Sequence, residues 1–576
     1  MSCRISWIAA LLCLAALSVP AAAQAAGVDM SRWRYNAEDD VYYQLGIPYC
    51  EKPVDLNYQT LAFFVPGAYL KGTPNGDGTY RCAVDKEGLA GGYRAVDAPI
   101  VIPVETPGYM AMPALTEYAN VKAYTDAGFV LVYAGCRGRA HGAPLGVTDL
   151  KAAVRFLRRE AERSKDSAER LPGSVDRIFT FGMSGGGAQS ALMGATGDSA
   201  LYAPYLTAIG AAEGVSDAVT GAMCWCPITN LDWANEAYEW NLGVSRTGLS
   251  AEMRELSERM GASYAAYVNA SGFKDANGGK LTLEQSPDGR WQADSYYDMV
   301  KAEVETSLNR FLADTTFPYD ADAGARQRGM NVIGRLNLPG TDDPRQGTAD
   351  RIENYDRVVR RDARGSVTLS GVYRTAQDYI DALNAAGTWV SYDAATNTAA
   401  ISSVDDFVKA LKPAVKSVGA FDDLGATQGE NMLFGVGDGQ GAHFDAHMAE
   451  LLDGTEYGPA FAADLAKTDS LGVGVQRRLD MYTPLHYLLE SSAGFRTSNI
   501  APYWRIRTGI AQGDTALNTE INLARALENC EAVKSVDFVM VWGLKHVEAE
   551  RRGSSTENFI RWVNACLAED AASAEW

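Results

Sequence analysis

Basic residues are in short supply in this chain. Its 576 residues hold 52 Lys and Arg against 72 Asp and Glu, so the formal net charge is −20 at pH 7. A protein that binds nucleic acid through its phosphates needs a basic surface, and an acidic protein is repelled by them. The charge balance therefore argues against a nucleic-acid partner and favours a soluble protein that acts on neutral or weakly charged small molecules.

Long hydrophobic runs are missing beyond the first residues of the chain. Residues 1–26 combine a positive charge at Arg4, an apolar run over Ile8–Val19 and small residues at Ala21–Ala23. This order is typical of a secretory signal peptide, and the apolar run is too short to span a membrane comfortably. We predict that residues 1–26 are removed and that the mature protein is secreted or periplasmic, without a membrane anchor.

Cysteine and histidine are both sparse. Seven cysteines follow residue 26, and export would permit disulfides. Proximity in the sequence makes Cys50 with Cys82, and Cys530 with Cys566, the plausible pairs. No spacing of Cys and His resembles a zinc site, so no metal ion or other cofactor is expected.

The chain contains apolar, strand-like segments that alternate with helix-like segments. Seven segments read as buried strands, because most of them are continuous apolar runs rich in Val, Ile, Phe and Tyr, which are typical of strands covered on both faces, as in a parallel sheet. They are 61–65, 100–104, 129–133, 178–181, 222–226, 504–510 and 536–542. Segments with helical spacing of apolar residues lie among them, at 149–159, 519–527 and 556–567. This alternation predicts an α/β fold with a doubly wound, mostly parallel sheet.

The alternation stops in the middle of the chain, which is richer in Asp, Asn, Gly and Ser. Helix-like pieces occur there at 252–267, 296–312, 376–383 and 404–411. The simplest organisation is one catalytic domain, formed by residues 27–230 and 499–576, that is interrupted by a lid domain over 231–498.

One glycine-rich segment carries the clearest chemical signal. Gly182-Met183-Ser184-Gly185-Gly186 matches the pattern G-x-S-x-G, with a strand-like run before it and helix formers after it. This strand–turn–helix context is that of the nucleophile elbow of α/β-hydrolases. We predict Ser184 as the nucleophile of an acyl-transfer reaction.

A serine hydroxyl needs a base to take its proton, and the base needs an acid to hold its tautomer. This fold supplies them in the order Ser, Asp or Glu, then His. His546 follows the last predicted strand and is the predicted base, and Asp514 is the first choice for the acid, with Glu520 the second. The usual position of the acid holds Gln512, so Asp514 has to reach in from two residues further on, or the triad is incomplete.

An oxyanion hole needs two backbone N–H groups aimed at the developing alkoxide. One is expected from Gly185, directly after the nucleophile. The other is expected from the loop after the early strand 100–104, where Gly108 and Tyr109 are both candidates.

With these residues the sequence resembles bacterial tannases of the Lactobacillus type, members of the α/β-hydrolase superfamily. The resemblance runs over nearly the whole mature chain, with insertions. Its specific strings are 65–70 (VPGAYL), 138–139 (GR), the elbow, 226–231 (CPITNL), 237–240 (AYEW), 430–435 (ENMLFG) and 504–507 (WRIR).

The resemblance implies hydrolysis of galloyl esters by a Ser–Asp–His triad, with the three phenolic hydroxyls of gallate held by a Lys, a Glu and an Asp. These three match Lys416, Glu430 and Asp514. In the family the triad acid is a separate Asp two residues earlier, and this sequence has Gln512 there. One carboxylate stands where the family has two, so Asp514 serves either the histidine or the phenol.

Three functions remain open from the sequence. The leading one is a secreted serine esterase on galloyl or other phenolic esters. The second is a feruloyl-type or general carboxylesterase, which the altered acid position favours. The third is a non-catalytic, hydrolase-like binding protein, which Gln512 favours and the pair of Ser184 and His546 disfavours.

Overall fold

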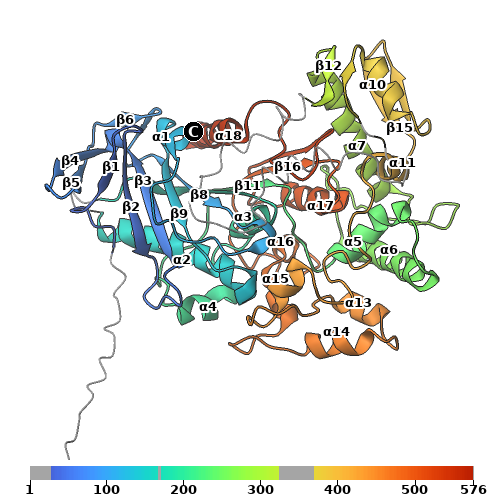
Figure 1. The fold of residues 1–576 in the computed structure, drawn as a ribbon, viewed down its shortest axis with the longest axis horizontal. Helices are drawn as coiled ribbons and strands as arrows, with labels where there is room; N and C mark the ends of the chain where they lie inside the picture. Colours follow the sequence, from blue (N-terminus) through green and yellow to red (C-terminus); the bar gives the residue numbers. More distant parts are fainter. Residues whose placement is uncertain (1–26, 166–169, 323–366, 368, 575–576) are drawn as a thin grey trace, which may run out of the picture.

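The computed structural model describes residues 27–165, 170–322, 367 and 369–574 (Figure 1). The predicted signal peptide lies outside this part of the chain. Within the described residues, no helix is both long enough and apolar enough to cross a membrane.

A nine-stranded sheet forms the centre of the molecule (Figure 1). In spatial order its strands are β1 (Arg34–Asn36), β2 (Val41–Pro48), β3 (Thr60–Pro66), β9 (Val130–Ala134), β8 (Pro99–Val104), β10 (Ser174–Met183), β11 (Gly221–Trp225), β16 (Tyr503–Gly509) and β17 (Ser535–Val541). The strands from β1 to β9 pair antiparallel, and those from β9 to β17 pair parallel. All seven predicted strands are found in this sheet, six of them in its parallel half, and burial on both faces explains why most of these sequences are apolar.

Helices cover both faces of the sheet, as β10 shows. Phe181 points to one face, where its ring lies 4.3 Å from that of Phe559 in α18 (Ser555–Ala574). Thr180, the preceding residue, points to the other face and shares a hydrogen bond of 2.9 Å with Ser190 of α3 (Gly185–Ala195). The other helices outside the insertion are α1 (Lys122–Asp126), α2 (Leu145–Arg163), α4 (Ala203–Ala208) and α17 (Leu517–Glu528). The doubly wound α/β fold predicted from the alternation is therefore confirmed.

A large, mainly helical insertion separates β11 from β16, and in Figure 1 most of its helices gather on one side of the sheet. Its helices are α5 (Ala234–Leu242), α6 (Ala251–Ser271), α7 (Ser295–Asp314), α10 (Ala376–Leu383), α11 (Val404–Leu411), α12 (Gly429–Phe434), α13 (Ala446–Leu451), α14 (Gly458–Leu465), α15 (Val475–Met481) and α16 (Pro484–Leu488). Its short strands form the pairs β12 (Tyr319–Asp320) with β13 (Val372–Tyr373) and β14 (Val390–Asp393) with β15 (Thr398–Ile401). The insertion corresponds to the predicted lid, whose limits at residues 231 and 498 stay a prediction.

Short strand pairs and 3₁₀ turns lie between the strands of the amino-terminal half of the chain. They are the pairs β4 (Leu70–Pro74) with β5 (Tyr80–Val84) and β6 (Leu89–Ala90) with β7 (Tyr93–Arg94), together with short 3₁₀ turns that include η2 (Pro107–Tyr109) and η3 (Arg139–His141). Of these, η2 follows β8 and enters the candidate site described below.

The predicted disulfides are wrong, because all seven cysteines after residue 26 are free. Cys50 is buried close to Asp149 and Arg137, whereas Cys82 is buried in β5 close to Tyr42. Proximity in the sequence therefore did not place the two sulfur atoms together.

Candidate active site

Ser184 occupies a sharp turn between β10 and α3. Its backbone lies in the left-handed region, at φ 60° and ψ −123°, which a residue with a side chain adopts only under strain. Glycine is required on either side of it, because a Cβ atom at Gly182 would collide with the carbonyl of Gly186, and one at Gly186 with the carbonyl of Val104. The G-x-S-x-G spacing is thus explained by close backbone approaches around a strained, partly buried serine.

His546 lies beside Ser184. It belongs to the loop between β17 and α18, and its Nε2 is 2.8 Å from the Ser184 Oγ. Its Nδ1 is 2.6 Å from the Oε1 of Gln512, in the loop after β16. Because an amide oxygen only accepts, the proton must sit on Nδ1, which leaves Nε2 free to accept the serine proton. The imidazole therefore has the tautomer that general-base catalysis requires.

Asp514, the first choice for the acid, lies farther away. Its Oδ2 is 3.8 Å from the His546 Nδ1, beyond hydrogen-bond distance but close enough for a favourable charge interaction. Gln512 thus makes the contact that a triad acid makes, and Asp514 faces the same histidine from the side. The roles of Ser184, His546 and Asp514 in catalysis remain predictions at this point.

A buried polar network lies behind Gln512. The Gln512 Nε2 donates to the Oγ1 of Thr508 over 2.6 Å and to the Oε1 of Glu520 over 2.7 Å. Glu520 also accepts from the hydroxyl of Thr515 over 2.9 Å. The Lys412 ammonium donates to the backbone oxygen of Gln512. Gln512, Glu520 and Lys412 are each only 1% exposed.

The two charged groups of this network carry displaced pKa values. Burial raises the pKa of Glu520 to about 7, while the ammonium of Lys412 opposes that change. Burial lowers the pKa of Lys412 to about 8, and the carboxylate of Glu520 opposes it. A perturbed, mutually compensating pair next to a Ser–His contact is typical of a functional site. Lys412 was missed from the sequence, because nothing in its local pattern separates it from an exposed helix-end lysine.

The loop that carries His546 is anchored at its far end by Glu550. This carboxylate is buried, forms a two-pronged ion pair with Arg505 of β16 at 2.6 Å and 2.6 Å, and accepts from the Trp225 indole over 2.9 Å. Arg505 belongs to the string at 504–507 that carried the sequence resemblance. Through Arg505, this segment of β16 therefore holds the loop of His546 against the sheet.

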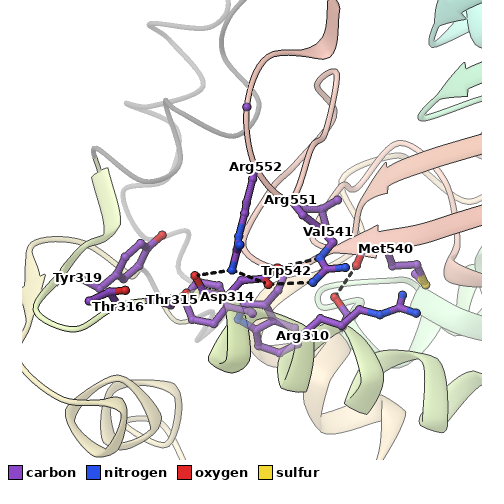
Figure 2. Close-up of a pocket in the computed structure, with 13 residues that line it drawn as sticks. Arg310, Asp314, Thr315, Thr316, Tyr319, Met540, Val541, Trp542, Arg551 and Arg552 are labelled. Carbon is purple, nitrogen blue, oxygen red and sulfur yellow. Dashed lines mark hydrogen bonds and ion pairs between the residues drawn. The ribbon is translucent and has the colours of Figure 1, made fainter. Parts of the chain in front are cut away.

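The same loop is tied to the insertion around a cavity of about 300 Å³ (Figure 2). Figure 2 shows Arg551 and Arg552 reaching the carboxylate of Asp314, at the end of α7, over 2.7 to 2.9 Å. At the start of the loop, the Trp542 indole donates to the Tyr379 hydroxyl of α10 over 2.9 Å. Both ends of the histidine loop are thus braced by the insertion.

The candidate oxyanion loop lies next to the start of α3. A Cβ atom at Gly185 would lie 2.5 Å from the Tyr109 nitrogen and 3.2 Å from the Gly108 nitrogen, so these amides adjoin the elbow. The Tyr109 N–H is already used, because it donates to the Thr106 oxygen over 2.9 Å. Arg139 fixes the loop by donating to the Gly108 oxygen over 2.9 Å. Of the two candidates, Gly108 is therefore the better donor beside Gly185.

The three predicted substrate-binding residues come from three different segments of the chain. Glu430 is a buried residue at the start of α12 and interacts electrostatically with Tyr109 of the oxyanion loop. Asp514 faces His546. Lys416 is a half-buried residue, and its ammonium lies 3.9 Å from the centre of the Phe421 ring.

Tyr238 connects two of these loops. Its hydroxyl donates to the Gly513 oxygen over 2.9 Å and accepts from the Lys416 N–H over 3.2 Å. The backbone positions that carry Lys416 and Asp514 are therefore held together by one side chain of α5. Tyr238 itself lies in the string at 237–240 of the sequence resemblance.

In the part of the chain that the structure describes, no three His, Cys, Asp or Glu side chains are arranged to hold a metal ion. The side chains around Ser184 are suited instead to proton transfer and to holding a polar organic molecule.

The strand order, the turn between β10 and α3 and the helical insertion after β11 define an α/β-hydrolase fold with a lid. Among solved structures the chain is similar to tannin acyl hydrolases. The Lactobacillus plantarum tannase matches with a TM-score of 0.63 and 25% identity, over 91% of this chain and 95% of that one. A tannin acyl hydrolase in complex with ethyl gallate matches with a TM-score of 0.62, 25% identity and coverage of 91% and 94%.

The Fusobacterium nucleatum tannase shares the fold at 22% identity, with a TM-score of 0.64 and coverage of 91% and 95%. No protein-family model and no curated protein sequence matches the chain. The resemblance to bacterial tannases that the sequence strings predicted is confirmed at the level of the whole structure.

Proposed function

We propose that this protein is a serine carboxylic-ester hydrolase that works through an acyl-enzyme on Ser184. The observation that carries the proposal is the position of His546, with Nε2 at 2.8 Å from the Ser184 Oγ and Nδ1 at 2.6 Å from the Gln512 Oε1. This is the nucleophile–base–orienting-group geometry of serine hydrolases, with an amide in the place of the usual carboxylate.

The reaction follows from these contacts. The Ser184 Oγ attacks the ester carbonyl carbon while His546 Nε2 takes the hydroxyl proton, and the oxyanion that forms is stabilised by the N–H groups of Gly185 and Gly108. Collapse of the tetrahedral intermediate breaks the bond to the alcohol, which leaves with the proton from His546. Water then attacks the acyl-enzyme by the same route, so the acid is released and Ser184 is restored.

The substrate class that we propose is a galloyl or related phenolic ester. The similar structures are tannin acyl hydrolases, two of them with ethyl gallate and 3,4-dihydroxybenzoate bound. Phenolic hydroxyls are hydrogen-bond donors that suit carboxylates, and an ammonium favours phenolate character. Glu430 at the start of α12, together with Asp514 and Lys416 on the two segments that Tyr238 links, supplies these groups. With the predicted signal peptide, such an enzyme would act outside the cytoplasm.

A panel of esters tests the proposed function. The purified mature chain should release gallic acid from methyl gallate and propyl gallate, and it should also cleave p-nitrophenyl acetate, whose activated leaving group makes few demands on the pocket. Cleavage of p-nitrophenyl acetate alone would indicate a general carboxylesterase. Turnover of none of these esters would contradict an esterase and support a binding protein.

Replacing Glu430 by glutamine should impair recognition of the phenol without impairing chemistry. A hydrogen bond to a charged group contributes about 1.5–3 kcal/mol, so we expect kcat/KM for methyl gallate to fall roughly ten- to a hundredfold, mainly through KM. Methyl benzoate, which lacks the hydroxyls, should be cleaved as by the wild type. Glu456→Gln on the exposed surface of the insertion is the control variant. Equal losses on both esters would show that Glu430 does not contact the phenol.

A further inference from the structure

We propose that Glu520 is a positioning residue of this active site: its buried carboxylate fixes the Gln512 amide with the oxygen towards His546 and supplies the negative charge that Gln512 lacks. The proposal rests on the esterase chemistry proposed above. It gives the site a row of four side chains, from Ser184 through His546 and Gln512 to Glu520.

The orientation of the Gln512 amide follows from its partners. An amide group can turn either its oxygen or its nitrogen towards a neighbour, and only the oxygen can accept the proton of His546 Nδ1. Both N–H bonds of Gln512 are taken, one by the Thr508 hydroxyl at 2.6 Å and one by the Glu520 carboxylate at 2.7 Å. A carboxylate only accepts, so the reversed amide would place two oxygens against each other in a buried site. Glu520 therefore excludes the orientation that would give His546 the wrong tautomer.

The Oε1 atom of Glu520 accepts several hydrogen bonds, which favour the ionised carboxylate. The Thr515 hydroxyl donates to it over 2.9 Å and the Thr508 hydroxyl over 3.3 Å, in addition to the Gln512 amide. Three donors on one oxygen stabilise the ionised form of the carboxyl group. Glu520 lies in the first turn of α17, where the helix dipole also favours negative charge.

A buried carboxylate of this kind is costly without a compensating charge, and Lys412 provides one. Its ammonium also binds the backbone oxygen of Gln512, so one lysine holds the loop and balances the charge behind it. Asp514 is the other charged group that faces this network, 3.8 Å from the His546 Nδ1 and near enough to Lys412 to act on its charge.

The consequence for catalysis is electrostatic. When His546 takes the serine proton it becomes an imidazolium, and its Nδ1–H stays bonded to the Gln512 oxygen. The amide passes no proton; it is polarised by the carboxylate on its nitrogen side, so its oxygen carries more negative charge towards the imidazolium. An amide backed by a carboxylate thus replaces the carboxylate that serine hydrolases place directly on the histidine.

The labelling rate of Ser184 with a fluorophosphonate tests the proposal, because this reagent reports the activated serine whatever the natural ester is. The serine oxygen bonds to phosphorus, fluoride leaves and His546 takes the serine proton, and intact-protein mass follows the product. In Glu520→Gln, which keeps the shape and loses the charge, we expect labelling to slow about ten- to a hundredfold, the size of effect found for outer partners of metal-binding histidines. Glu528→Gln, on the same helix and paired with Arg525, should label at the wild-type rate.

A charge swap separates positioning from mere structural support. The double variant Gln512→Glu/Glu520→Gln moves the carboxylate onto the histidine and keeps both the volume and one buried charge opposite Lys412. It should recover labelling to within a few-fold of the wild type, and it also decides the case if Glu520→Gln does not fold. Wild-type labelling in Glu520→Gln, or no recovery in a folded swap variant, would overturn the proposal. Absence of labelling in the wild type would instead contradict the esterase function on which it rests.

Discussion

Replacing Ser184 by alanine should reduce ester hydrolysis by about 10⁶-fold, the order of loss seen when the serine nucleophile is removed from a serine hydrolase triad. The variant lacks the atom that forms the acyl-enzyme, so the covalent route is closed. His546 and the amides of the oxyanion loop remain, and they should leave a small residual rate over water. The measurement is kcat on p-nitrophenyl acetate and, in parallel, on methyl gallate.

Ser190→Ala is the matched control for this experiment. Ser190 lies in the same helix, α3, and its buried hydroxyl bonds to Thr180, away from His546. Its loss should change stability slightly and leave turnover unchanged. If both Ser184→Ala and Ser190→Ala retained most of the wild-type rate, Ser184 would not be the nucleophile.

The fold could be predicted from the sequence because the sheet is buried on both faces. A short apolar run such as 222–226 is typical of a strand covered on both faces, and the break in alternation predicted the insertion. Short polar strands such as β4 and β14 carry no such pattern, because they are exposed on one side or both. The predicted disulfides were wrong for a different reason: the spacing of cysteines in the sequence does not determine the distance between their sulfur atoms in the fold.

The candidate site also has one part that the sequence predicts and another that it does not. The contact between Ser184 and His546 could be expected from the sequence, because glycines flank the turn of the one and chain order places the other after the last strand. The arrangement behind His546 was not predictable, since it depends on which side chain of the 509–515 loop turns inwards. Gln512 turns inwards and Asp514 remains at 3.8 Å, so the second-choice acid, Glu520, enters the site through an amide. Lys412 completes this arrangement from the insertion, a hundred residues away in the sequence.

Replacing Glu550 by alanine should cause the largest loss of stability among single changes near the site. Glu550 is 2% exposed and is the partner of Arg505, whose side chain is 6% exposed, and it also accepts from the Trp225 indole. Removal of one member of a buried ion pair leaves the other charge without its partner, which costs about 3–5 kcal/mol. Asp537 lies 3.3 Å from the Arg505 Nε and is itself 44% exposed, so it can offset only part of this loss.

The free energy of unfolding from urea titration should therefore fall by about 3–5 kcal/mol in Glu550→Ala. Glu550→Gln keeps an acceptor for Trp225 but loses the charge, so its loss should be smaller. Glu531→Ala removes a surface ion pair in which both side chains are mostly exposed, and it should change stability by less than about 1 kcal/mol. Because Glu550 lies four residues after His546, its removal should also lower the rate of Ser184 labelling while the protein is still folded. Glu550→Ala with the stability and labelling rate of Glu531→Ala would show that the histidine loop is held by its contacts with the insertion, at Asp314 and Tyr379, rather than by the sheet.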